Sequence, residues 1–178
     1  MILLKKIFIL AAMILAAFTC TAFAANNFGT KVVIIGGGEF KTADFYKIVQ
    51  KNLGSKSGNK YECGNDIQKR YQVFIMNRYD IGEDKPRKQD FTDFTAWSGY
   101  GKVLFLIIDE NVDTQTHGKH SQKNRSTIQM DAYLATNSGI SDFNTTSQEF
   151  TSKASNLRAR RGAFEKCLKD IATSMNLF

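Results

Sequence analysis

The sequence predicts an α/β fold with a mixed sheet, arranged as one domain of two or three layers. Two uninterrupted apolar runs, "VVII" and "VLFLII", are typical of strands that are covered on both faces. The segment 127–135 alternates strictly between apolar and polar residues, which is typical of a half-buried antiparallel strand. We therefore expect central strands at 31–36 and 102–109 and an antiparallel hairpin over 102–135.

Four helices are expected around these strands, because apolar residues recur at helical spacing. They lie near 42–53, 66–80, 87–98 and 156–175. The first follows the glycines 36–38, and Thr42 can cap its first turn. Its apolar side is formed by Phe45, Ile48, Val49 and Leu53.

The next segments are less regular. Residues 54–60 are expected to turn, and 61–63 is a weakly supported short strand. Asn65 and Gln68 resemble a capping box at the start of the second helix. Its apolar stripe comprises Ile67, Tyr71, Phe74, Ile75 and Tyr79. The third helix is expected to begin near Pro86 and to bury Phe91, Phe94 and Trp97.

The C-terminal part is expected to alternate loops and strands before the last helix. Asp109–Asn124 is polar and is expected to form a loop with a mobile hairpin tip. A turn is expected at residues 137–139. Residues 144–152 are expected to form a strand at the edge of the sheet, because they are too polar for a central strand. The last helix is expected to start near Ser155. Its buried side comprises Phe164, Cys167, Leu168, Ile171 and Met175.

Residues 1–24 are typical of an export signal. Two lysines precede a short apolar run, and "AFA" at 22–24 supplies the small residues of a cleavage site. A membrane anchor is the competing interpretation, but the run is short for about 20 spanning residues. We expect residues 25–178 to form a single exported domain, periplasmic or extracellular, with no stable membrane span. Cys20 raises the question of lipidation, although Phe18 and Thr19 fit a lipidation box poorly.

Cys63 and Cys167 remain after such a cleavage. An exported pair could form a disulfide, and two buried thiols are the alternative. The whole chain carries a formal charge of +7, which falls when Lys5 and Lys6 leave with the leader. This mild excess does not favour nucleic acid as a partner.

The three glycines, Gly36, Gly37 and Gly38, stand between a strand and a helix. This context suits phosphate or another anion bound at backbone amides, but the spacing matches neither common phosphate-binding motif. The alternative is a glycine turn that lets the chain leave a crowded strand end.

His117 and His120 are the only histidines and could share a metal ion, although a dedicated site needs further ligands. No catalytic signature accompanies the histidines, the cysteines or the carboxylate pairs, so no catalytic residue and no cofactor are assigned. Arg158, Arg160 and Arg161 gather at the start of the last helix, where a surface or partner contact is the favoured interpretation.

Three segments carry a resemblance to a known group of domains. "SGYGKVLFLIID" leads from a helix end into a buried strand, "TIQMDAYLATNSGI" alternates and then turns, and "RRGAFEKCLKDIATSMN" closes the chain as a helix. Together they resemble the compact α/β domain of the curli-secretion lipoproteins, the penicillin-binding-protein activator lipoproteins and the TolB amino-terminal domain. They also resemble short exported bacterial proteins with no assigned activity. The resemblance implies a non-enzymatic adaptor or assembly part of the cell envelope.

The first functional hypothesis is therefore an exported interaction module that binds an envelope protein or a cell-wall component. The second is a small-molecule, anion or metal-binding protein that uses the 36–38 glycine turn or the 117–120 histidine loop. A hydrolase with an unrecognised site is a third, weaker hypothesis.

Overall fold

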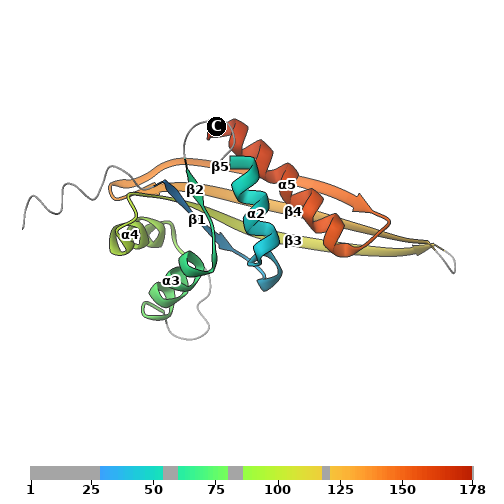
Figure 1. Ribbon diagram of the computed structural model, residues 1–178, viewed down its shortest axis with the longest axis horizontal. Helices are drawn as coiled ribbons and strands as arrows, with labels where there is room; N and C mark the ends of the chain where they lie inside the picture. The colour runs from blue at the N-terminus through green and yellow to red at the C-terminus, as the bar shows by residue number, and fades with distance from the viewer. Residues whose placement is uncertain (1–28, 54–59, 80–85, 118–120, 178) are drawn as a thin grey trace, which may run out of the picture.

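The computed structural model describes residues 29–53, 60–79, 86–117 and 121–177. These residues form one five-stranded mixed sheet with α-helices on both faces (Figure 1), so the α/β fold class is confirmed. The leader and Cys20 lie outside the described residues. The elements are β1 (Thr30–Ile35), the short 3-10 helix η2 (Gly38–Phe40), α2 (Ala43–Leu53), β2 (Tyr61–Glu62), α3 (Asn65–Met76), α4 (Lys88–Ser98), β3 (Lys102–His117), β4 (Ser121–Thr136), β5 (Gly139–Ser152) and α5 (Asn156–Ser174).

The sheet has the strand order β2-β1-β3-β4-β5. β1 runs parallel to both neighbours, and its register with β3 extends from Lys31 opposite Val103 to Ile35 opposite Ile107. β3, β4 and β5 follow one another as antiparallel neighbours. The expected central strands, the hairpin and the polar edge strand are thus confirmed, and β5 begins earlier than expected.

The alternation of side chains along β1 and β3 builds a core on each face of the sheet. On one face Val32 and Leu104 pack with residues of α2 and α5, among them Phe45 and Phe164. On the other face Val33 and its neighbours pack with α3 and α4. This second core contains Val33, Tyr71, Phe74, Phe91, Phe94, Val103, Phe105, Tyr133 and Ala135. The described part of the chain is therefore a three-layer α/β/α arrangement (Figure 1).

The hairpin is longer than the sequence predicts. β3 continues through the polar stretch that was expected to be a loop, and β4 begins at Ser121. Polar pairs support the extension across the two strands: Arg125 lies 3.1 Å from Asp113, and Thr114 donates a hydrogen bond of 3.5 Å to Asn124. Cross-strand pairs of this kind stabilise a ladder without burying apolar area, so a polar run can remain a strand.

Three details of the helices differ from expectation. α3 begins at Asn65 after Gly64, so the Asn65–Gln68 capping box is wrong, and the helix ends at Met76. Trp97 is 49% exposed, whereas Phe91 and Phe94 are buried as expected. The start of α5 is confirmed, because the Ser155 side chain accepts a hydrogen bond from the Arg158 amide at 3.1 Å. In the described residues no helix combines the length and the apolar character needed to cross a membrane.

Candidate ligand pocket at the carboxyl end of strand β1

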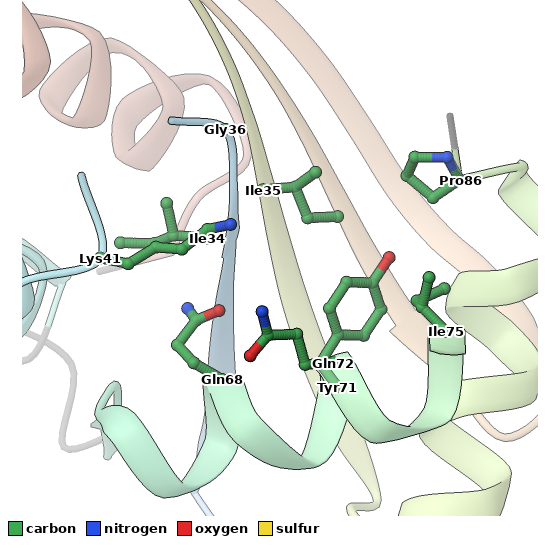
Figure 2. Close-up of a pocket in the computed structure, with 9 residues that line it drawn as sticks. All are labelled: Ile34, Ile35, Gly36, Lys41, Gln68, Tyr71, Gln72, Ile75 and Pro86. Carbon is green, nitrogen blue, oxygen red and sulfur yellow. The ribbon is translucent and has the colours of Figure 1, made fainter. Parts of the chain in front are cut away.

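A pocket of about 370 Å³ opens beside the carboxyl end of β1, between that strand and α3 (Figure 2). Its volume falls within the range of about 300–1,000 Å³ that is common for small-molecule sites. We call it the β1 pocket. It is lined by Ile34, Ile35, Gly36, Lys41, Gln68, Tyr71, Gln72, Ile75 and Pro86.

The pocket exists because β2 is too short to cover the edge of β1. β2 pairs only with Thr30 and Lys31, which leaves the backbone further along β1 without a strand neighbour on that side. Gln68 of α3 takes the neighbour's place. With its amide oriented to match, it accepts from the Ile34 nitrogen at 2.6 Å and donates to the Ile34 oxygen at 3.1 Å. This satisfies buried backbone groups and holds α3 beside the pocket.

Gly36 lines the pocket and has a packing reason to be glycine. A Cβ at this position would lie 3.1 Å from the Ile108 oxygen and 3.2 Å from the Ile108 Cβ, so glycine lets β1 approach β3 closely. Gly37 and Gly38 are exposed and do not line the pocket. A Cβ on Gly37 would lie nearest to the Glu39 carboxyl group, and one on Gly38 would have no neighbour within 4 Å. Of the three predicted ligand-binding glycines, the structure places only Gly36 in the pocket wall.

Tyr71 forms part of the wall on the α3 side. Its side chain packs edge-on against Phe94, with ring centroids 5.1 Å apart, and the residue is only 8% exposed. Its hydroxyl group is buried and has no hydrogen-bond partner among the described residues. Burial raises the pKa of this hydroxyl well above its usual range, and the nearby charges of Asp90 and Tyr79 add to the effect. Tyr71 is therefore a neutral group that can still donate a proton to a hydrogen bond.

Lys41 brings a positive charge to the pocket. It follows η2 directly, and its side chain extends from that segment toward β1 (Figure 2). Among the described lining residues Lys41 is the only one that carries a full charge at neutral pH. The walls otherwise combine isoleucine, proline and tyrosine carbon atoms with two glutamine amides. The arrangement can bind a small molecule, and it does not resemble a nucleophile with its base.

The predicted histidine site is only partly described. His117 is the last residue of β3, and its backbone pairs with Ser121, whereas His120 lies outside the described residues. Within the described ranges, no three His, Cys, Asp or Glu side chains gather as a metal site would require. The metal site at the 117–120 loop stays a prediction.

Cys63 and Cys167 are free, buried thiols rather than a disulfide. Both belong to the core between the sheet and helices α2 and α5. The Cys167 thiol donates to the Ile128 carbonyl at 3.3 Å. Burial raises the pKa of each thiol to about 12. The structure therefore shows the alternative that the sequence left open, two buried and unreactive thiols.

Two of the three predicted interface arginines make contacts inside the chain. Arg160 lies 2.7 Å from the buried carboxylate of Glu110 and 3.8 Å from Glu39. Arg161 forms an ion pair with Asp44 of α2. These arginines attach α5 to β3, η2 and α2, whereas Arg158 is exposed. A partner contact through this cluster is an untested prediction.

A second surface feature is an exposed apolar area on the outer side of α3 and α4. Val73 and Met76 of α3 are 50% and 73% exposed, and Trp97 of α4 is 49% exposed. The Arg70 guanidinium lies 5.5 Å from the Trp97 ring and 5.2 Å from the Tyr100 ring. We call these five residues the α3–α4 surface.

Sequence reasoning missed most of the pocket. Tyr71 and Ile75 belong to the apolar stripe of α3, but periodicity cannot distinguish a core position from a pocket wall. No role was assigned to Lys41 from the sequence. A short strand was expected at 61–63 and is present as β2, but the sequence does not show that this strand pairs with the start of β1 and leaves the rest of that edge open.

Comparison with known proteins gives little more. No protein-family model matches the chain, and no curated protein matches it either. The lipoprotein GNA1162 from Neisseria meningitidis aligns with a TM-score of 0.43 and 11% identity, over 83% of this chain and 98% of that one. Protein CT253 from Chlamydia trachomatis aligns with a TM-score of 0.43 and 8% identity, over 83% of this chain and 95% of that one.

A minor lipoprotein from Acinetobacter baumannii aligns with a TM-score of 0.28 and 9% identity, over 82% of this chain and 87% of that one. Bacterial lipoproteins are thus among the similar structures. At these TM-scores and identities the likeness carries no argument about function. The curli-secretion, penicillin-binding-protein activator and TolB groups are not among these three, so that finer resemblance stays a prediction.

Proposed function

We propose that this chain is an exported, non-enzymatic protein of the cell envelope, and that it binds a small molecule in the β1 pocket. The signal-like residues 1–24 support export. One observation carries the binding role: Tyr71 lines the pocket, and its buried hydroxyl group has no partner among the described residues. The pocket also lies at the carboxyl end of a parallel strand, where α/β domains place ligands.

Native mass spectrometry of the protein purified from its own cells tests this proposal. We expect a bound small molecule that survives gentle ionisation and disappears in an Ile75→Trp variant, because the larger side chain fills the pocket. Val73→Trp is the matched control, since Val73 lies on the same helix and is 50% exposed. The control should keep the ligand.

A ligand should also raise the free energy of unfolding. At one hundred times the dissociation constant the increase is about 2.7 kcal/mol for a ligand that binds only the folded state. Absence of any bound mass, together with no thermal stabilisation by a metabolite library, would overturn the proposal. Equal loss of ligand from both tryptophan variants would place the site elsewhere.

A second candidate function is binding of an envelope protein or a cell-wall component through the α3–α4 surface. The observation that favours it is the exposure of Trp97 beside Arg70, because tryptophan and arginine are frequent anchors of protein interfaces. Such a surface would make the chain an interaction or assembly module.

Site-specific photo-crosslinking in the native envelope tests this second candidate. A photoreactive residue in place of Met76 should capture one dominant partner, and Trp97→Ala should reduce the capture. The same residue in place of Lys47, which is exposed on α2, serves as the control. Capture of the same partners from both positions would contradict a specific role for the α3–α4 surface.

A further inference from the structure

We propose that the ligand of the β1 pocket is a small molecule with one anionic group on a compact apolar body. This inference rests on the proposed function, that the pocket binds a small molecule, and it adds the chemical class. The anionic group can be a carboxylate or a phosphate. Both offer the same chemistry to the pocket, an oxygen acceptor with negative charge.

The charge of the pocket carries the first step. Lys41 makes no ion pair with any described residue, and no described lining residue is acidic. An ammonium group beside a partly enclosed apolar wall attracts an anion more strongly than it would in open solvent, because the local dielectric constant is lower. A cationic ligand would meet repulsion from Lys41.

The hydrogen-bonding groups carry the second step. The buried Tyr71 hydroxyl has no partner among the described residues, and leaving such a group unpaired costs free energy. Because this hydroxyl keeps its proton, it suits a ligand acceptor better than a ligand donor. The Gln68 amide is already engaged by Ile34 and is not available to the ligand.

The apolar walls carry the third step. Ile35, Ile75 and Pro86 line the pocket together with the Tyr71 ring (Figure 2). Side chains of this kind favour an aliphatic or aromatic body over a sugar or a free inorganic ion. A polar metabolite would lose hydration there without regaining its hydrogen bonds.

Four probes with six carbon atoms each separate the head group from the body: hexanoate, hexyl phosphate, hexanol and hexylamine. The protein expressed from its full sequence is titrated with each probe by isothermal calorimetry at low and high salt. We expect hexanoate or hexyl phosphate to bind about tenfold more tightly than hexanol, since charge-assisted hydrogen bonds are the stronger ones. Added salt should weaken only the anionic probes. The ratio between the two anions identifies the head group.

Two variants connect the affinity to the proposed residues. Lys41→Gln should weaken the binding of the preferred anion about tenfold and leave hexanol unchanged. Lys47→Gln on α2 is the matched control and should change nothing. Tyr71→Phe should weaken the binding of the preferred anion. Circular dichroism and the melting temperature should show that this variant is folded.

The outcomes distinguish the two levels of the argument. Equal binding of hexanol and the anions, or an unchanged affinity in Lys41→Gln, would overturn the anionic class and leave a small-molecule pocket in place. Preference for hexylamine would overturn the class as well. If none of the four probes binds and no ligand accompanies the purified protein, the proposed function falls with the inference.

Discussion

Gly162 occupies a position on α5 where a single added atom would meet an aromatic ring. A Cβ there would lie 2.3 Å from Cγ of Phe150 and 2.4 Å from its Cδ1. Glycine at this position therefore leaves room for the Phe150 side chain of β5 to pack under the helix. The helix accepts the usual disadvantage of glycine, about 1 kcal/mol relative to alanine, in return for this contact.

We expect Gly162→Ala to lower the free energy of unfolding by about 1–2 kcal/mol, because overpacking of a core by one methyl group costs more than the helix propensity returns. Urea denaturation measures the change. Gly38→Ala is the control: a Cβ there meets nothing, so a neutral effect or a gain of about 0.4–1 kcal/mol is expected. A stabilised Gly162→Ala protein would mean that Phe150 moves aside at little cost.

The two thiols give a pH-dependent prediction. Burial raises the pKa of Cys63 and Cys167 from the ordinary value of 9.0 to about 12, so the folded state favours the protonated form. Their contribution to stability is fully present below pH 9 and is lost as the pH rises toward 12. The unfolding free energy should therefore fall over this range, and less steeply in Cys63→Ala.

Alkylation tests directly whether the Cys63 and Cys167 thiols are free and buried. In the native protein at pH 8 iodoacetamide should leave both cysteines unmodified, and in urea without a reductant it should modify both, as peptide mass spectrometry would show. Modification in urea only after reduction would instead reveal a disulfide.

At the scale of the element, the attachment of α5 depends on a buried ion pair. The Glu110 side chain is 6% exposed and accepts hydrogen bonds from Arg160 at 2.7 Å and from the Ser126 hydroxyl at 2.7 Å. Arg160 also stacks over Phe40, 5.5 Å from the ring centroid. The pair joins the start of α5 to β3 and η2.

We expect Arg160→Ala to destabilise the protein by about 3–5 kcal/mol, since it leaves an uncompensated carboxylate in a buried place. The double variant Arg160→Met with Glu110→Leu should regain most of the loss, because a buried ion pair and an apolar pair often have similar net effects. Chemical denaturation of the single variants Arg160→Met and Glu110→Leu and of the double variant measures the coupling. Additive losses would show that the two groups do not act as a pair.

The elements show which signals a sequence carries. Buried strands and amphipathic helices were predicted from periodicity, and β1, α2 and α5 appear close to their expected bounds. The polar continuation of β3 was not predicted, because its stability comes from cross-strand partners such as Arg125 and Asp113 that a single strand does not reveal. Trp97 was expected to be buried, but helical spacing alone does not show how far the neighbouring helix covers that side of α4.

At the scale of the whole molecule, the sheet is unevenly covered. Near β1, Val103 and Phe105 of β3 are buried on the α3 and α4 side, and Leu104 and Leu106 are buried on the α2 and α5 side. Further along the hairpin, Asn111, Lys123 and Arg125 are exposed, while their neighbours Asn124 and Ser126 are buried on the α5 side. One half of the sheet is thus a central layer, and the other half has a solvent-facing side.

Amide hydrogen exchange should follow this division. We expect the amides of 103–106 and 132–135 to exchange most slowly, and those of 111–115 and 123–127 to exchange faster, because opening there exposes less apolar surface. In β5, alternate amides should exchange fast, since an edge strand leaves every second amide without a partner strand. Uniform protection along the hairpin would indicate that its polar face is covered in solution.

The fold was predicted from the sequence, whereas the β1 pocket was not, because the two depend on contacts over different distances along the chain. The fold follows from repeated patterns, each visible within about ten residues. The β1 pocket instead requires Gly36, Lys41 and Tyr71 to meet across three elements, and it depends on the early end of β2. Only the three-dimensional arrangement brings these residues together.

The parallel pairing of β1 has a consequence for synthesis. Val32 lies opposite Leu104 in the register, so the partner strand is translated about 70 residues after β1. At a synthesis rate of about 5–20 residues per second, the part of β3 that pairs with the segment Val32–Ile35 is completed roughly 4–14 s after that segment. During that time four β-branched side chains lack both the neighbouring strand β3 and the C-terminal helix α5. We expect this segment to be where a holding chaperone binds the nascent chain.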